Sequence, residues 1–142
     1  MTKTYLPNKS ECMPAKNILF ARTGIRYGEL LNSPRLLRRA NELFLEGLKL
    51  IDPKICFDTF FRETLPKELI PASFEEAGRV TVFLSTLGRA IENRMNEHAN
   101  RGGVFDAFIL DSWASESLEA LNRSFDRKLR EKNGRGTMRF SP

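Results

Sequence analysis

Hydrophobic residues recur along much of the chain at helical spacing. From Ser33-Pro34 to Asp52-Pro53, apolar residues return every three or four positions. This predicts an amphipathic helix with Ser33 as its N-cap and Pro34 in its first turn. The apolar stripe consists of Leu37, Ala40, Phe44, Leu48 and Ile51. The charged residues of this segment, Arg39 and Glu46 among them, are expected to face water.

Two further helices are predicted in the second half of the chain. One covers residues 89–100 and is ended by Gly102-Gly103; the other covers residues 104–132 and is closed by Asn133-Gly134. The longer helix has a sustained apolar stripe. Its members are Phe105, Phe108, Ile109, Trp113, Leu118, Leu121, Phe125 and Leu129.

Two segments have strand character. Residues 55–64 alternate with a period of two, and residues 79–86 form a nearly continuous apolar run. Such a run predicts a strand that is buried on both faces at the centre of a sheet. Residues 16–21 are read as a short strand or the start of a helix. Ser73 followed by Glu76 predicts a capping box for a short helical turn.

Length and composition favour one globular domain. The chain has 142 residues, of which 41% are hydrophobic and 29% charged. Residues 1–15 are polar and proline-marked and are interpreted as an irregular lead-in, so the domain is assigned to residues 16–142. The sequence shows neither a secretory h-region nor an apolar run near about 18 residues. The cytoplasm is therefore the expected compartment, with Cys12 and Cys56 as reduced thiols.

Familiar catalytic motifs are missing from the sequence. One histidine and two unspaced cysteines do not provide a zinc site, and no glycine-rich nucleotide loop precedes a helix. His98 is interpreted as an ordinary surface residue near a helix end. Asp111 lies beside the apolar stripe of the last helix, so it is expected to be partly buried and held by backbone groups or an arginine. Alternatively, it orders a ligand loop.

The net charge of +5 is unevenly distributed. Seven basic residues occur between 123 and 139, against two acidic ones. The favoured interpretation is a solvated helix end, where cations suit the helix dipole. An anionic ligand, an acidic partner protein or a nucleic acid are the alternatives. Nucleic acid is the least favoured, because the cluster lacks interleaved aromatic side chains for stacking.

The end of the chain is a candidate ligand segment. Gly134, Gly136 and Pro142 predict an extended stretch with free backbone groups, and Arg139 within it could meet a carboxylate. By residue pattern alone, a frayed terminus is the favoured interpretation of this stretch.

Several segments together resemble a known family, over about residues 16–142. They are Thr86-Leu87-Gly88 after a strand, the helix containing Ala107-Phe108-Ile109-Leu110-Asp111, and the closing Gly136-Thr137-Met138-Arg139-Phe140-Ser141-Pro142. Arg26-Tyr27-Gly28 resembles the family's N-terminal segment. The family is the activation domain of vitamin B12-dependent methionine synthase, and in particular its small stand-alone relatives.

The resemblance implies an α+β fold in which an antiparallel sheet is covered by long amphipathic helices. It also implies binding of S-adenosylmethionine, whose methyl group restores methylcobalamin after accidental oxidation. The cobalamin would be carried by a partner methyltransferase, and a flavodoxin-type protein would supply the electron. The domain would thus bind and position the methyl donor and contribute no nucleophile of its own.

The resemblance also suggests the binding residues. The family signature is Arg-x-x-x-Gly-Tyr, and Arg139, Phe140, Ser141 and Pro142 match its first four positions; the sequence does not include the Gly-Tyr pair and is expected to lack the C-terminal part of the family domain. These four residues, with Asp111, are the predicted S-adenosylmethionine contacts. The alternative from another functional class is an interaction domain that keeps the fold and does not bind the ligand.

Overall fold

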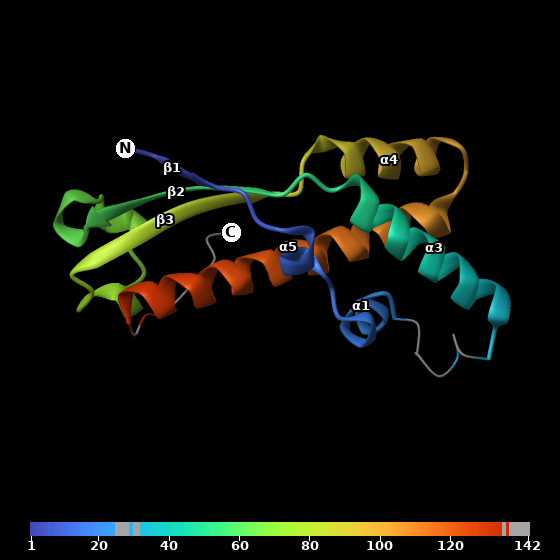
Figure 1. Cartoon of the computed structure of the whole chain (residues 1–142), viewed down its shortest axis with the longest axis horizontal. Coiled ribbons are helices and arrows are strands. Elements are labelled where there is room, and N and C mark those ends of the chain that lie inside the picture. The colour runs from blue at the N-terminus through green and yellow to red at the C-terminus, as the bar shows by residue number, and fades with distance from the viewer. Residues whose placement is uncertain (25–28, 30–31, 135, 137–142) are drawn as a thin grey trace.

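The predicted amphipathic helices are present in the computed structural model, which describes residues 1–24, 29, 32–134 and 136. They are α3 (Pro34–Leu50), α4 (Arg89–Asn100) and α5 (Val104–Asn133), and α1 (Lys16–Arg22) precedes them. Residues 16–21 therefore belong to a helix. At about 1.5 Å per residue, the 30 residues of α5 span about 45 Å, so this helix runs the length of the molecule (Figure 1).

A three-stranded antiparallel sheet lies along the C-terminal part of α5 (Figure 1). Its strands are β1 (Lys3–Tyr5), β2 (Lys54–Phe61) and β3 (Arg79–Thr86), in the order β1-β2-β3. The register pairs Tyr5 with Ile55 and Phe57 with Phe83. The fold is α+β with an antiparallel sheet, as expected.

The N-terminal residues are more ordered than their composition predicted. Residues 1–15 contain β1 and the short 3-10 helix η1 (Lys9–Cys12), so an irregular lead-in is wrong for this part of the chain. The reason is tertiary, because the Tyr5 ring stacks on Phe125 with centroids 5.8 Å apart. Cys12 is fully buried in the main core, and its carbonyl accepts a hydrogen bond from Ser117.

Strand β3 corrects a second prediction, because it lies at the edge of the sheet and not at its centre. Its odd-numbered residues face α5, where Phe83 packs on Phe125 and Ser85 bonds to Asn122. On the other face, Val82 and Leu84 are 51% and 76% exposed. The continuous apolar run is therefore buried on one face only.

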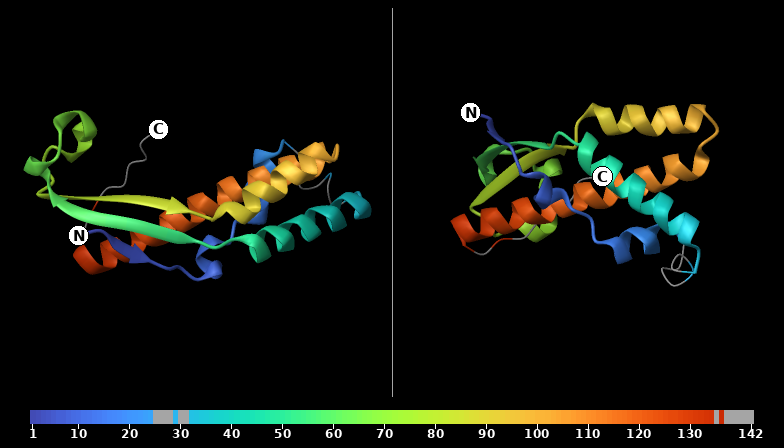
Figure 2. Two further views of the ribbon diagram at one scale, coloured as in Figure 1. Left: turned by 90° about the horizontal axis from the view of Figure 1, so that it is seen from above. Right: turned by 45° about the vertical axis from the view of Figure 1, so that its right-hand side comes forward.

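The molecule divides into two regions along α5, which Figure 2 shows from two further directions. We call α1, α3, α4 and the N-terminal part of α5 the helical half, and the sheet with the C-terminal part of α5 the sheet half. Trp113 is fully buried between the two, and its ring meets Phe44 edge-on at 5.9 Å. Among the described residues, no helix is long and apolar enough to cross a membrane.

The segment between β2 and β3 consists of turns. It contains the 3-10 helices η2 (Arg62–Thr64), η3 (Lys67–Leu69) and η4 (Ala72–Phe74). The predicted short helical turn is thus η4, but Pro71 and not Ser73 is its N-cap residue. This segment brings Phe74 beside the start of β3, where it lines a hollow of the sheet half.

Candidate functional site

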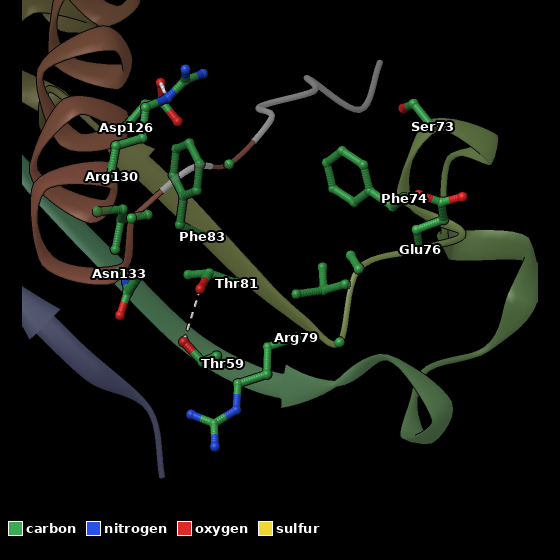
Figure 3. Close-up of a pocket in the computed structure, with 16 residues that line it drawn as sticks. Thr59, Ser73, Phe74, Glu76, Arg79, Thr81, Phe83, Asp126, Arg130 and Asn133 are labelled. Atoms are coloured by element: carbon green, nitrogen blue, oxygen red, sulfur yellow. Dashed lines mark hydrogen bonds and ion pairs between the residues drawn. The ribbon is translucent and has the colours of Figure 1, made fainter.

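A groove of about 680 Å³ lies between β3, the C-terminal end of α5 and the turns before β3. Figure 3 shows its three sides: the strands with Thr59, Thr81 and Phe83, the helix with Asp126, Arg130 and Asn133, and the turn with Ser73, Phe74 and Glu76. A volume of this size is typical of a small-molecule site. We call it the β3–α5 groove.

The strand side of the groove combines hydroxyl groups with an aromatic ring. Thr59 and Thr81 are directly opposite each other in the register, and their hydroxyl oxygens are 2.9 Å apart. The Phe83 ring is held by Phe125 at 5.2 Å, and Phe74 stands across the groove from the strand (Figure 3). The groove therefore offers hydrogen-bonding groups between two aromatic side chains.

Charges of both signs line the same groove. On α5, Arg130 Nε lies 2.7 Å from Asp126 Oδ2, an i,i+4 ion pair whose aspartate is mostly buried and whose arginine is half exposed. Arg79 lies over the Phe61 ring at 5.1 Å. Glu76 on the turn is exposed. A ligand in this groove could thus meet a cation and a carboxylate within one site.

The groove lies at the entry to the predicted ligand segment. Gly134 and Gly136 are among its lining residues. Gly134 ends α5 with a φ of 82°, a left-handed conformation that glycine adopts without strain. Arg139, Phe140, Ser141 and Pro142, four of the five predicted contacts, lie outside the described residues.

Asp111, the fifth predicted contact, is exposed on α5 and does not line the groove. The prediction that it is partly buried is wrong, because it points away from the apolar stripe. The buried carboxylate of α5 is Glu116, which is 2% exposed and bonds Arg22 Nε at 2.7 Å. Its Oε2 has no hydrogen-bond partner. In the sequence, the signal for the burial of Glu116 was its position three residues after Trp113, which places both side chains on the same face of the helix.

His98 also differs from its sequence interpretation. It is 13% exposed and lies between two carboxylates, with Nε2 3.5 Å from Glu46 and Nδ1 3.6 Å from Asp106. Arg39 donates to Asp106 and Arg94 to Glu46, so α3, α4 and α5 share one charge network. The Arg39 hydrogen bonds, which outweigh partial burial, hold the pKa of Asp106 below its usual range. Arg39 and Glu46 therefore do not simply face water.

Three basic residues near the C-terminal end of α5 have acidic partners within the molecule. Arg123 pairs with Glu119, Arg130 with Asp126, and Lys128 lies 3.5 Å from Glu11. Partial burial would raise the pKa of Glu11, but hydrogen bonds from Asn8, Tyr5 and Ser124 and the charge of Lys128 lower it. The three basic side chains are nevertheless about half exposed.

The remaining candidate chemistry is limited. Among the described residues, no group of three or more His, Cys, Asp or Glu side chains could hold a metal ion. Both cysteines are free thiols; burial, with the Glu11 charge adding to it, raises the pKa of Cys12 to about 11. The β3–α5 groove is therefore the best-formed candidate site in the part of the chain that the structure describes.

Comparison with known proteins does not assign the chain to a family. No protein-family model matches it, and no curated protein matches it either.

Proposed function

We propose that this protein is an S-adenosylmethionine-binding activation module that supports reductive remethylation of cobalamin on a partner methyltransferase. The observation that carries the proposal is the β3–α5 groove, whose lining includes Gly136, three residues before the signature-like segment 139–142 in the sequence. The proposal extends to a cytoplasmic location, with cobalamin carried by the partner and a flavodoxin-type protein as electron donor.

The side chains of the groove fit the chemical groups of this ligand. S-Adenosylmethionine combines an adenine ring, a ribose diol, an ammonium and a carboxylate. Phe74 and Phe83 offer aromatic surface for a planar base, and the carboxylate of Asp126 can accept from a diol or an ammonium. Arg130 and Arg139 are the candidate cations for the ligand carboxylate, Arg139 by its resemblance to the family signature.

A binding role also explains why no catalytic constellation was found. The bound ligand supplies an activated methyl group, and the attacking nucleophile would belong to the partner's cobalamin. This chain would contribute affinity and orientation, for which a groove with paired charges and aromatic walls is sufficient. The chain would therefore act as one component of a methyltransferase system without being the complete enzyme.

Isothermal titration with S-adenosylmethionine tests this proposal on the chain as it stands. Binding is expected, and Arg139→Met and Asp126→Asn should each weaken it by about tenfold, because each removes a charge-assisted hydrogen bond of about 1.5 kcal/mol. Asp111→Asn is the matched control, since Asp111 is an exposed carboxylate on the same helix outside the groove. The proposal fails if the unaltered chain gives no heat, or if Asp126→Asn and Asp111→Asn bind equally well.

The second candidate is an interaction domain that keeps the fold without the ligand. The exposed apolar side chains Val82 and Leu84 favour it, because a β-sheet face open to water is normally polar. The same titration separates the two candidates.

A further inference from the structure

One face of the sheet has the composition of an interior but is not covered by any of the described residues. The even-numbered residues of β2 and β3 point away from α5, and Figure 1 shows no helix lying over the strands on that side. Leu84 is 76%, Val82 51% and Phe60 37% exposed, and Cys56 on the neighbouring strand is half-buried. Only Val80, close to the turns, is buried. We call Cys56, Phe60, Val82 and Leu84 the bare face.

The sequence pattern and the structure disagree at this face in an informative way. The run in β3 is typical of a strand covered on both sides, whereas the fold covers one side. Exposed apolar patches of this kind mark interaction sites. A second layer against the bare face would satisfy the sequence pattern without any change in the fold.

Charges on the bare face indicate what forms that layer. Lys54 and Asp58 lie on β2 two residues before and two residues after Cys56, so each is about 7 Å from it on the same face. A two-fold axis that crosses the strands at Cys56 would place Lys54 of each copy over Asp58 of the other copy. Two pairs of opposite charges would then face each other. Lys54 has no ion pair within the described part of the chain, and Asp58 binds the N-terminal ammonium at 3.1 Å.

The positions of the apolar residues on the bare face are compatible with the same two-fold axis. Cys56 and Leu84 are partners in the register, as are Asp58 with Val82 and Lys54 with Thr86. The axis therefore brings Leu84 against Leu84 of the second copy, and Val82 against Thr86. The charged pairs would lie on β2 beside an apolar centre, an arrangement common in protein interfaces.

We propose that the bare face is a self-association surface, on which a second copy of this chain packs face to face about an axis at Cys56 and Leu84. Face-to-face sheets pack about 10 Å apart with their strands within about 30° of each other. Three strands of eight residues or fewer span about 14 by 26 Å, or about 370 Å² in projection. This is below the roughly 800 Å² per partner of a standard stable interface, so the dimer is weak.

Sedimentation equilibrium from micromolar to near-millimolar concentration is the first test. The unaltered chain should form dimers at the upper end, and Leu84→Glu should remain monomeric because it buries two facing carboxylates. Leu45→Glu is the matched control: Leu45 is 64% exposed on α3, so the same change there should leave association intact. Circular dichroism checks that each variant is folded. A monomer at every concentration, or equal association of Leu84→Glu and the unaltered chain, overturns the proposal.

The charge pairs allow a sharper test. Lys54→Asp places like charges together and should weaken association at least tenfold, whereas adding Asp58→Lys to it should restore most of the loss. A double variant as weak as the single one would contradict the two-fold arrangement.

Cross-linking at Cys56 tests the position of the axis independently of variants on the face. Strands about 10 Å apart exceed the Cα separation of about 4.4–6.8 Å that a disulfide needs. A short bis-maleimide, which adds to two thiols without any redox step, should instead link two copies through Cys56. Cys56→Ser should abolish the linked species and Cys12→Ser should not, because Cys12 is fully buried. Linkage that survives Leu84→Glu at an unchanged rate would show random collision.

Discussion

The two halves of the molecule differ in whether their charged and apolar side chains are packed within the fold or left open at the surface. In the helical half, charged groups meet within the fold: Arg39 with Asp106, Arg94 with Glu46, and His98 between the two carboxylates. In the sheet half, the β3–α5 groove and the bare face remain open. Both halves share α5 and belong to one packed structure. Both surfaces on which the proposals rest therefore lie in the sheet half.

The largest stability difference between the halves is expected at Trp113. It is fully buried at the junction with α3, so Trp113→Ala should lower the free energy of unfolding by about 3–5 kcal/mol. Leu84→Ala on the bare face should lower it by less than about 0.5 kcal/mol in dilute, monomeric protein. Urea denaturation measures both. Equal losses would mean that the bare face is covered within a single chain.

Gly47 on α3 tests how tightly the helical half is packed. A Cβ at this position would lie 2.7 Å from the Trp113 ring, which is fully buried. Gly47→Ala should therefore cost about 1–3 kcal/mol, despite the better helix propensity of alanine. Gly78→Ala is the control, since a Cβ there would meet nothing within 4 Å. A stabilised Gly47→Ala protein would show that α3 and α5 can separate without cost.

Ser117 links the N-terminal turn η1 to α5. Its hydroxyl donates to the Cys12 carbonyl at 2.6 Å in a buried setting. Ser117→Ala leaves that carbonyl unpaired and should cost about 1 kcal/mol in thermal or urea unfolding. The comparison is Ser115→Ala on the same helix, for which a change within about 0.5 kcal/mol is expected. Similar losses of unfolding free energy in both variants would show that the hydrogen bond from Ser117 to Cys12 does not stabilise the fold.

The smallest expected effect concerns pH and the charge network. Because Arg39 lowers the pKa of Asp106 in the folded chain, the carboxylate stabilises the fold above its unfolded pKa of about 3.9. That contribution is lost as the pH falls through the lower folded value. Asp106→Asn should cost about 1 kcal/mol at neutral pH, and its difference from the unaltered chain should shrink below about pH 4.

Urea titrations at several pH values measure this dependence. Asp111→Asn is the control, because its carboxylate is exposed and should leave the unfolding free energy at neutral pH unchanged. A difference between Asp106→Asn and the unaltered chain that stays constant into the acid range would exclude the ionised pair as its source.

Much of the local structure could be predicted from the sequence, since it depends on periodicity and chain breakers. Helices α3, α4 and α5 and strand β3 begin and end close to the predicted residues. It was harder to predict which face of an element is buried. Phe108 was expected in the core but is 46% exposed, whereas Leu110 is fully buried. A stripe read from spacing alone does not show where α5 changes from packing against helices to packing against the sheet.

The candidate site was less predictable, because its members come from segments far apart in the sequence. Phe74, Thr81 and Asp126 form no motif, and only the hairpin and the end of α5 bring them together. Similarly, His98 has two carboxylates beside it that lie on other helices. The expected burial of Asp111 is wrong, and the burial of Glu116 was not predicted, for the same reason: burial depends on the neighbouring helix, here α1.

The sequence by itself determined most of the longer helices and strands, and so a chain of mixed α and β character, because hydrophobic period, prolines and glycines act within a few residues. It also identified β3 as a strand with two apolar faces. Only the tertiary structure decided that β3 lies at an edge and that α5 covers one of its faces. Strand order and packing depend on contacts between distant residues, such as Tyr5 with Phe125, and local periodicity carries no information about them.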